Sequence, residues 1–63
     1  MSEEAIRGAR FRHHAREVRI IAAGIDEPEC RENLLGLAED YDRIAESIEL
    51  RVHCEQFGNP TLH

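Results

Sequence analysis

The segment that decides the fold lies near the middle of the chain and reads GIDEPE at residues 24–29. Gly24 can adopt the left-handed conformation with which many helices end. Pro28 fits the first turn of a following helix, where its missing N–H costs no hydrogen bond. Asp26 and Glu29 have the spacing of a capping box, with Asp in the place of the usual Ser or Thr. The segment therefore predicts a short turn between two helices.

A wide apolar stripe runs along the residues that follow this turn. At 100° per residue its members fall within an arc of about 120°, which is the width expected of a helix packed in a bundle. We therefore expect a helix over residues 27–56. The stripe consists of Cys30, Leu34, Leu37, Ala38, Tyr41, Ile44, Ala45, Ile48 and Val52.

The residues before the turn also repeat with helical spacing. Steps of four, three, four and three residues connect Phe11, Ala15, Val18, Ala22 and Ile25, with His14 and Ile21 on the flank. Ser2 can act as the N-cap, and the acidic side chains at positions 3 and 4 then meet the positive end of the helix dipole. This pattern predicts a helix over residues 3–23. Because the loop is short, the two helices should be antiparallel neighbours.

The two halves together carry a pattern that resembles a group of short, uncharacterised bacterial helical-hairpin proteins. The pattern runs Phe11-Arg12-x-x-Ala15-x-Glu17-x-Arg19-x-x-Ala22 and then Asp26-x-Pro28-x-x-Arg31-x-x-Leu34-Leu35-x-Leu37-Ala38-x-x-Tyr41-x-x-Ile44-Ala45. It covers about half of the chain. The resemblance implies a two-helix fold, and it implies no activity and no cofactor.

Length and composition limit the class of protein. The chain has 63 residues and a formal net charge of −5. We expect a single domain over residues 1–63, with its turn at residues 24–28. Such a domain is too small for a barrel, a dinucleotide-binding fold or a deep catalytic pocket. Residues 58–63 cannot continue the second helix and are expected to form a loose tail.

The sequence favours a cytoplasmic location. The amino terminus has neither the basic start nor the apolar stretch of a secretory signal. The longest apolar run, residues 20–23, is far shorter than a membrane span requires. Cys30 and Cys54 are 24 positions apart, which is roughly 36 Å along one helix. They cannot then form a disulfide within the chain, and a reducing compartment fits these two thiols.

Counting outward from the turn pairs residues of the two helices whose numbers sum to about 51–52. The contacts that this register predicts are Phe11–Tyr41, Ala15–Leu37, Val18–Leu34 and Ala22–Cys30. It leaves the second helix from about residue 50 onward without a partner in the first helix.

A single hairpin cannot cover all of its apolar residues. The first helix has a second apolar face, formed by Ile6, Ala9, Ile20 and Ala23. We therefore expect a homo-oligomer, most simply a symmetric dimer that forms a four-helix bundle. The residues expected in its core or interface are Phe11, Ala15, Val18, Ile21, Ala22, Leu34, Leu37, Ala38, Tyr41, Ile44, Ile48 and Val52. The alternative is a monomer with a few exposed apolar side chains.

Charge is divided between the two halves. Residues 5–23 carry five Arg and one Glu, a net charge of +4, and residues 26–55 carry ten acidic residues and three Arg, a net charge of −7. One interpretation is that the basic helix pairs with the acidic one. The other is that the Arg-rich helix binds nucleic-acid phosphates. The negative charge of the whole chain favours pairing, and so does the absence of any recognised nucleic-acid-binding motif.

Metal binding and catalysis have little support in the sequence. The pairs with helical spacing are His13/Glu17, His14/Glu17 and Glu49/His53. No four-ligand set converges within one chain, so we expect neither a metal nor another cofactor. Cys54 follows His53, but adjacent helical residues do not face each other, so no activated nucleophile is expected and the protein should not be an enzyme. The first helix also lacks the bulky apolar face of a membrane anchor.

One apolar patch lies away from the main stripe. Leu50, Cys54 and Phe57 recur with spacings of four and three residues, so a continuing helix places them on one face. We interpret them as a contact surface, within the oligomer or for another protein. The sequence thus predicts a small, non-catalytic interaction module that self-associates. A nucleic-acid-binding dimer that uses the Arg-rich helix is the alternative.

Overall fold

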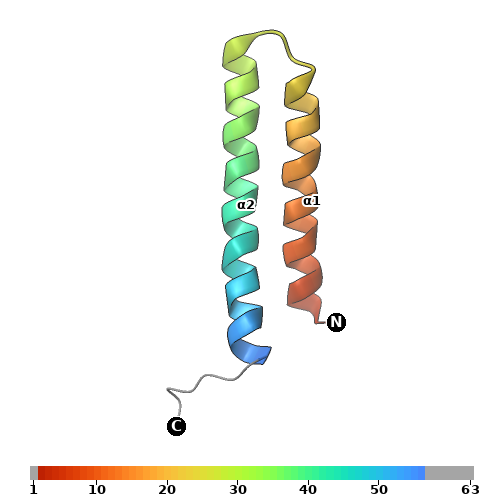
Figure 1. The fold of residues 1–63 in the computed structure, drawn as a ribbon, viewed down its shortest axis with the longest axis vertical. Coiled ribbons are helices and arrows are strands. Elements are labelled where there is room, and N and C mark those ends of the chain that lie inside the picture. Colours follow the sequence, from red (N-terminus) through yellow and green to blue (C-terminus); the bar gives the residue numbers. More distant parts are fainter. Residues whose placement is uncertain (1, 57–63) are drawn as a thin grey trace.

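The computed structural model describes residues 2–56, which form two α-helices and a short connection. Helix α1 spans Glu3–Ala23 and helix α2 spans Pro28–Gln56. The two helices lie side by side and run in opposite directions, with the connection at one end of the molecule (Figure 1). This arrangement confirms the predicted all-α antiparallel hairpin. The second helix begins one residue later than expected, at the proline.

The start of α1 follows the predicted capping pattern. Ser2 has an extended backbone, and its side-chain oxygen accepts a hydrogen bond of 3.0 Å from the backbone N–H of Ala5. This bond satisfies one of the N–H groups that a helix leaves unpaired in its first turn. Glu3 and Glu4 occupy that turn, where their negative charges favour the positive end of the helix dipole.

The end of α1 differs from the expected left-handed stop. Gly24 has φ of −94° and ψ of 1°, which any residue can adopt. Its N–H donates to the carbonyl of Ile21 at 3.0 Å, and the N–H of Ile25 donates to the carbonyl of Ala22 at 3.0 Å. These tighter three-residue bonds satisfy the last carbonyls without a change of handedness. The prediction was therefore right about where the helix ends and wrong about how it ends.

The connection is held by an arginine of the following helix. The backbone N–H of Arg31 donates to the carbonyl of Glu27 at 3.0 Å and starts the hydrogen-bond pattern of α2. The guanidinium of the same residue donates to the carbonyl of Ile25 at 3.0 Å. Arg31 thus bridges the end of one helix and the start of the next. Within residues 2–56, the side chains of Asp26 and Glu29 make no capping bond, so the proposed capping box is absent.

A narrow seam of small residues joins the two helices. The buried residues are Gly8, Ala15 and Ala22 on α1 and Ala38, Ala45 and Ile48 on α2. The half-buried apolar residues beside them are Phe11, Val18, Leu34, Tyr41 and Val52. On both helices the seam repeats every seven residues, which is the period of antiparallel coiled-coil packing. Small side chains at the centre allow the helices to approach closely and leave little volume for a large core.

The observed register is about one helical turn away from the predicted one. Gly8 packs against Ile48, so the numbers of facing residues sum to about 56. The aromatic rings of Phe11 and Tyr41 do meet, with centroids 5.9 Å apart. The physical reason for the shift is that helical side chains lean toward the amino terminus of their own helix. In an antiparallel pair the side chains of the two helices lean in opposite directions along the hairpin. Residues whose side chains meet therefore have numbers that sum to more than those of residues whose backbones lie at the same level.

Three expectations about pairing are corrected by this register. Leu37 and Cys30 are exposed and do not pack beneath the alanines that were expected to face them. Val52 is half-buried, and Arg51 forms an ion pair of 3.0 Å with Glu4. The second helix therefore keeps partners in the first helix beyond residue 50.

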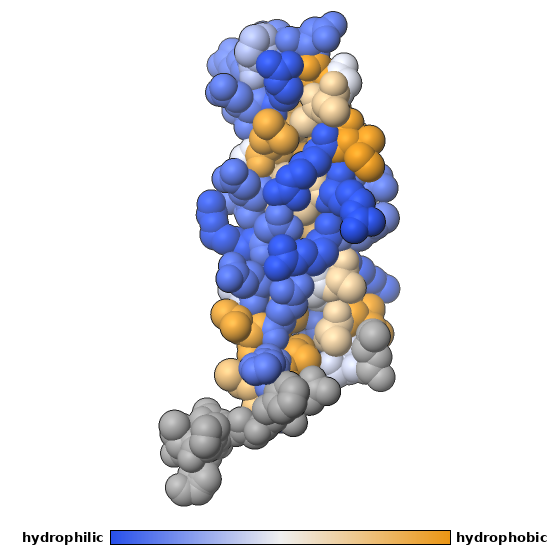
Figure 2. Space-filling model, viewed as in Figure 1, coloured by the Kyte–Doolittle hydropathy of each residue, from blue (hydrophilic) through white to orange (hydrophobic). Residues whose placement is uncertain are grey.

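The hairpin is a single layer of secondary structure. Its Cα atoms extend over 53 × 21 × 10 Å, so the shortest dimension is about that of one helix. On the face that Figure 2 shows, hydrophilic side chains fill the middle of the molecule over both helices, with hydrophobic side chains above and below them. A layer this thin leaves both broad faces of the hairpin open to solvent.

Candidate interaction surface

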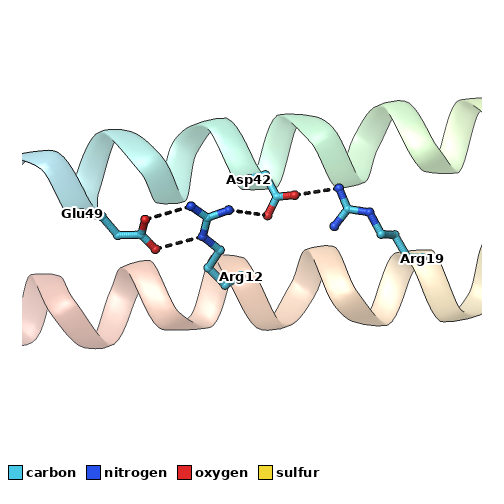
Figure 3. A network of polar contacts seen from close by, with 4 residues as sticks. All are labelled: Arg12, Arg19, Asp42 and Glu49. Atoms are coloured by element: carbon cyan, nitrogen blue, oxygen red, sulfur yellow. Dashed lines mark hydrogen bonds and ion pairs between the residues drawn. The ribbon is translucent and has the colours of Figure 1, made fainter.

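Four side chains form a chain of ion pairs across one side of the seam, and we call them the charged face: Arg12, Arg19, Asp42 and Glu49. Arg12 donates two hydrogen bonds to Glu49, at 2.9 and 2.8 Å, and one to Asp42 at 3.0 Å. Arg19 donates to the other oxygen of Asp42 at 2.7 Å. The four residues alternate in sign along the hairpin, and their side chains meet between the two helices (Figure 3).

The ion pairs shift the pKa values of side chains in the charged face. Hydrogen bonds from Arg19, and then from Arg12, hold the pKa of Asp42 below its ordinary value. The hydrogen bonds from Arg12 lower the pKa of Glu49 in the same way. The bonds to Glu49 and Asp42 raise the pKa of Arg12. All these groups therefore favour their charged forms when the hairpin is folded.

The segregation of charge seen in the sequence thus includes pairing within one chain. Arg12 and Arg19 come from the basic half, and both carboxylates that they bind come from the acidic half. Arg51 and Glu4 extend the pairing to the open end of the hairpin. Such bonds fix which sides of the two helices meet, although exposed ion pairs add little to stability.

Part of the basic helix remains unpaired in the described chain. Within residues 2–56, Arg7, Arg10 and Arg16 make no ion pair. Arg16 lines a shallow hollow together with Arg12 and Arg19, but Asp42 lies in the same hollow. The strongest cluster of positive charge therefore already contains a carboxylate, which weakens it as a phosphate-binding surface.

Four residues on the opposite side of the seam form what we call the apolar face: His14, Ile21, Leu37 and Ile44. At 100° per residue, Arg12 and Arg19 lie about 60–80° to one side of the centre of the α1 seam, and His14 and Ile21 lie about 80–100° to the other. The same spacing on α2 places the carboxylates of the charged face on one side and the leucine and isoleucine on the other. One broad face of the hairpin therefore carries the chain of ion pairs and the other is apolar in its middle, with Arg7 and Arg51 on the same lines of the two helices near the open end.

The aliphatic residues of the apolar face are largely uncovered. The exposed fraction is 55% for Ile21, 40% for Leu37 and 43% for Ile44. Between them, the ring of His14 lies 5.5 Å from that of Tyr41 and 6.5 Å from that of Phe11, measured between centroids. The contact between His14 and Tyr41 connects the two helices across the middle of the face.

The structure locates the twelve residues that the sequence assigned to a core or an interface. Ala15, Ala22, Ala38 and Ile48 are buried in the seam, whereas Phe11, Val18, Leu34, Tyr41 and Val52 are half-buried at its edges. Ile21, Leu37 and Ile44 are exposed on the single hairpin, so they do not belong to its core. Their place in an interface between chains stays a prediction.

Sequence reasoning missed Gly8, which is buried against Ile48 of α2. The signal was present, because positions 8, 15 and 22 repeat at seven residues. Glycine has no apolar side chain and so did not register in a search for hydrophobic periodicity. The sequence predicted that the basic helix pairs with the acidic one, but it did not identify the ion pairs of Arg12 with Asp42 and Glu49.

The predicted partner patch is only partly described. Leu50 is 59% exposed and Cys54 is exposed, both on the last turns of α2. Phe57, the third member, lies outside the described residues. The hairpin leaves Leu50 uncovered, which agrees with its predicted position away from the main apolar stripe.

The other candidate sites do not assemble into a centre. Within residues 2–56, no group of three or more His, Cys, Asp or Glu side chains is placed to hold a metal ion. His13 and Glu17 form an ion pair of 3.6 Å on α1. Cys30 and Cys54 are free thiols. No helix in the described part of the chain has the length and hydropathy of a membrane span.

The function of this chain is inferred from its two faces. The charged face is internally paired, whereas the apolar face has aliphatic side chains that nothing in the hairpin covers. Comparison of the chain with protein-family models, with curated proteins and with solved structures gives no match.

Proposed function

We propose that this protein is a small, non-catalytic interaction module that associates with a second copy through its apolar face to form a four-helix bundle. The module binds itself first, and another protein is a second class of partner, for which Leu50 and Cys54 offer an exposed contact surface. We also infer a cytoplasmic location, which suits two free, exposed thiols.

The exposure of Ile21, Leu37 and Ile44 on one face is the observation that carries the proposal. Stable domains usually consist of at least two packed layers around a hydrophobic core. This hairpin is one layer, with alanine and glycine filling most of its seam. A second hairpin on the apolar face supplies the missing layer and removes these side chains from water.

The charged face also supports association through the apolar face, because its own charged side chains are unfavourable to bury in a contact. Asp42 and the two arginines are already paired, and burying them in a second interface would cost the solvation of several charges. Association through the apolar face leaves the whole ladder in water. The two faces are thus complementary in role, one directed to solvent and one to a partner.

The mass of the protein in solution tests the proposal. Sedimentation equilibrium or light scattering at micromolar concentration should give twice the mass of the 7.2 kDa chain. Leu37→Glu should reduce the mass to that of one chain, because it places a charge in the contact. Ile20→Glu is the matched control, since Ile20 is 63% exposed on α1 and lies outside the apolar face. A wild-type protein that is folded and monomeric would contradict the proposal.

A nucleic-acid-binding dimer that uses α1 is the alternative. Arg7, Arg10 and Arg16 are the cations that could contact phosphates, since each lacks a carboxylate partner within residues 2–56. The net charge of −5 and the pairing of Arg12 and Arg19 oppose it. A gel-shift assay with mixed DNA and RNA separates the two functions, because phosphate binding must weaken steeply as salt increases.

A further inference from the structure

We infer that the second copy docks end over end, about a twofold axis that crosses the apolar face at the level of His14 and Tyr41. In this arrangement α1 packs antiparallel against α1 of the partner, and α2 packs antiparallel against α2 of the partner. The inference rests on the proposed self-association and specifies its geometry. It follows from the order of apolar and charged residues along the two helices.

The two aliphatic residues that α2 contributes to the apolar face lie at equal distances from one level along the helix. Leu37 and Ile44 are seven residues apart, so both lie on the same line of the helix, with their midpoint beside Tyr41. A half-turn about that level places Leu37 against Ile44 of the partner subunit and Ile44 against Leu37 of the partner subunit. Each of these side chains then packs against the other kind of aliphatic residue in the partner subunit, and not against the equivalent residue.

The charged edge of α1 is symmetric about the same level. Arg10 and Glu17 are seven residues apart on the outer edge of the apolar face, and their midpoint lies beside His14. Both side chains are exposed. A half-turn brings Arg10 beside Glu17 of the partner subunit and creates two equivalent ion pairs. Because the rings of His14 and Tyr41 are 5.5 Å apart, the midpoints on the two helices share one level and one axis serves both.

The remaining charge near the axis is compensated within each chain. Asp40 lies at the same level on the outer edge of α2, so the half-turn brings it toward Asp40 of the partner subunit. Its carboxylate already accepts a hydrogen bond of 3.2 Å from Arg43, which reduces the repulsion between the two copies. The axis therefore places no unpaired acidic group at its centre.

The other twofold arrangement of two hairpins places both connections at the same end. Then α1 faces α2 of the partner, and residues of equal level meet. Glu17 would approach Asp40 of the partner subunit, and Arg7 would approach Arg51 of the partner subunit. Both contacts bring like charges together, although Asp40 also pairs with Arg43 and Arg51 also pairs with Glu4 within each chain. The end-over-end dimer instead pairs Arg10 with Glu17 of the partner subunit, and this pairing of opposite charges favours it over the alternative.

Cysteine cross-linking tests the position of the axis. In a Cys30→Ser/Cys54→Ser background, His14→Cys should form a disulfide-linked dimer under mild oxidation, because the axis brings the two positions close together. A disulfide needs Cα atoms within about 7 Å, a condition that residues on diagonally opposite helices do not meet. Ile20→Cys in the same background is the control and should stay monomeric in a denaturing, non-reducing gel. A His14→Cys dimer that does not cross-link would overturn the inferred axis.

A charge exchange provides a second test that does not depend on a new bond. Arg10→Glu or Glu17→Arg alone should raise the dimer dissociation constant at least about tenfold, because each places like charges together twice. The double variant restores opposite charges and should return the constant to within about threefold of the wild-type value. Arg16→Glu, a charge reversal elsewhere on α1, should have little effect. A double variant as weak as the two single changes combined would count against the arrangement.

Different results would overturn the proposed function and the proposed geometry. A wild-type protein that sediments as a folded monomer removes both the proposed function and this geometry. A wild-type dimer that Leu37→Glu dissociates, but that shows neither cross-linking at position 14 nor rescue by charge exchange, keeps the function and overturns the geometry alone.

Discussion

Gly8 sets the distance between the helices near the open end of the hairpin. An ideal Cβ at this position would lie 3.3 Å from Cγ2 of Ile48 and 3.7 Å from Cγ of Glu49. The first of these distances is shorter than most contacts of a real Cβ, so the helices have little space to give. Gly36 on α2 is different, because no neighbouring atom lies within 4 Å of its Cβ position.

The two glycines should therefore respond oppositely to the same substitution. Gly36→Gln should raise the free energy of unfolding by about 0.5–1 kcal/mol, since glutamine favours a helix more than glycine does. Gly8→Gln should lower it by about 1–3 kcal/mol, because the new side chain overpacks the seam against Ile48. Urea denaturation of both variants measures the difference. Equal stabilisation by both would show that the helices are not in close contact at Gly8.

Tyr41 joins the seam to the apolar face, because its ring meets those of Phe11 and His14. Tyr41→Ala should lower the free energy of unfolding by about 2–3 kcal/mol, somewhat less than for a fully buried aromatic residue. Leu50→Ala is the comparison, with an expected change within about 0.5 kcal/mol for a side chain outside the hairpin contact. Thermal melts followed by circular dichroism test the contrast, and equal effects of the two changes would exclude a packing role for Tyr41.

At the scale of the element, periodicity predicted most of what was observed. The bounds of α1, the span of α2 within one residue and the apolar stripe all follow from local patterns that a sequence displays directly. The register did not follow, because it depends on the lean of side chains and on the close approach at Gly8. The ion-pair ladder was equally out of reach, since Arg12 can bind both Asp42 and Glu49 only in that register.

The ion pairs of the charged face also make the pairing of α1 with α2 depend on pH. The pKa values of Asp42 and Glu49 are lower in the folded chain than in the unfolded chain. Their contribution to stability is therefore fully present above the unfolded-state values, about 4 to 4.5, and is lost as the pH falls through the lower folded values. The melting temperature should decrease as the pH falls below about 4.5.

Neutral isosteric replacements check that assignment. The Asp42→Asn/Glu49→Gln double variant should melt at a lower temperature than the wild type at pH 7 and should approach it at acidic pH, where both wild-type carboxylates have lost their charge. Asp40→Asn is the matched control, since among residues 2–56 the ion pair of Asp40 is with Arg43 on its own helix. A wild-type protein and double variant with parallel pH profiles would show that the ladder does not contribute.

The proportions of the hairpin determine its dependence on a partner. A single layer whose Cα atoms extend over 10 Å in the shortest direction has a seam of small buried residues, and large aliphatic side chains lie on its surface. Small chains bury a low fraction of their surface and are correspondingly marginal when isolated. Folding and association should therefore be coupled, since the second hairpin covers the apolar face that the first leaves open.

Coupling of this kind predicts that stability depends on protein concentration. For a dimer that dissociates as it unfolds, the melting temperature must rise with concentration by mass action. The wild-type protein should therefore melt at a higher temperature at 500 µM than at 5 µM, on the order of several degrees across this range. Leu37→Glu should remove the dependence, because it prevents the contact, whereas Ile20→Glu should retain it. Circular dichroism melts at both concentrations make the comparison, and a wild-type melting temperature independent of concentration would place all of the stability within one hairpin.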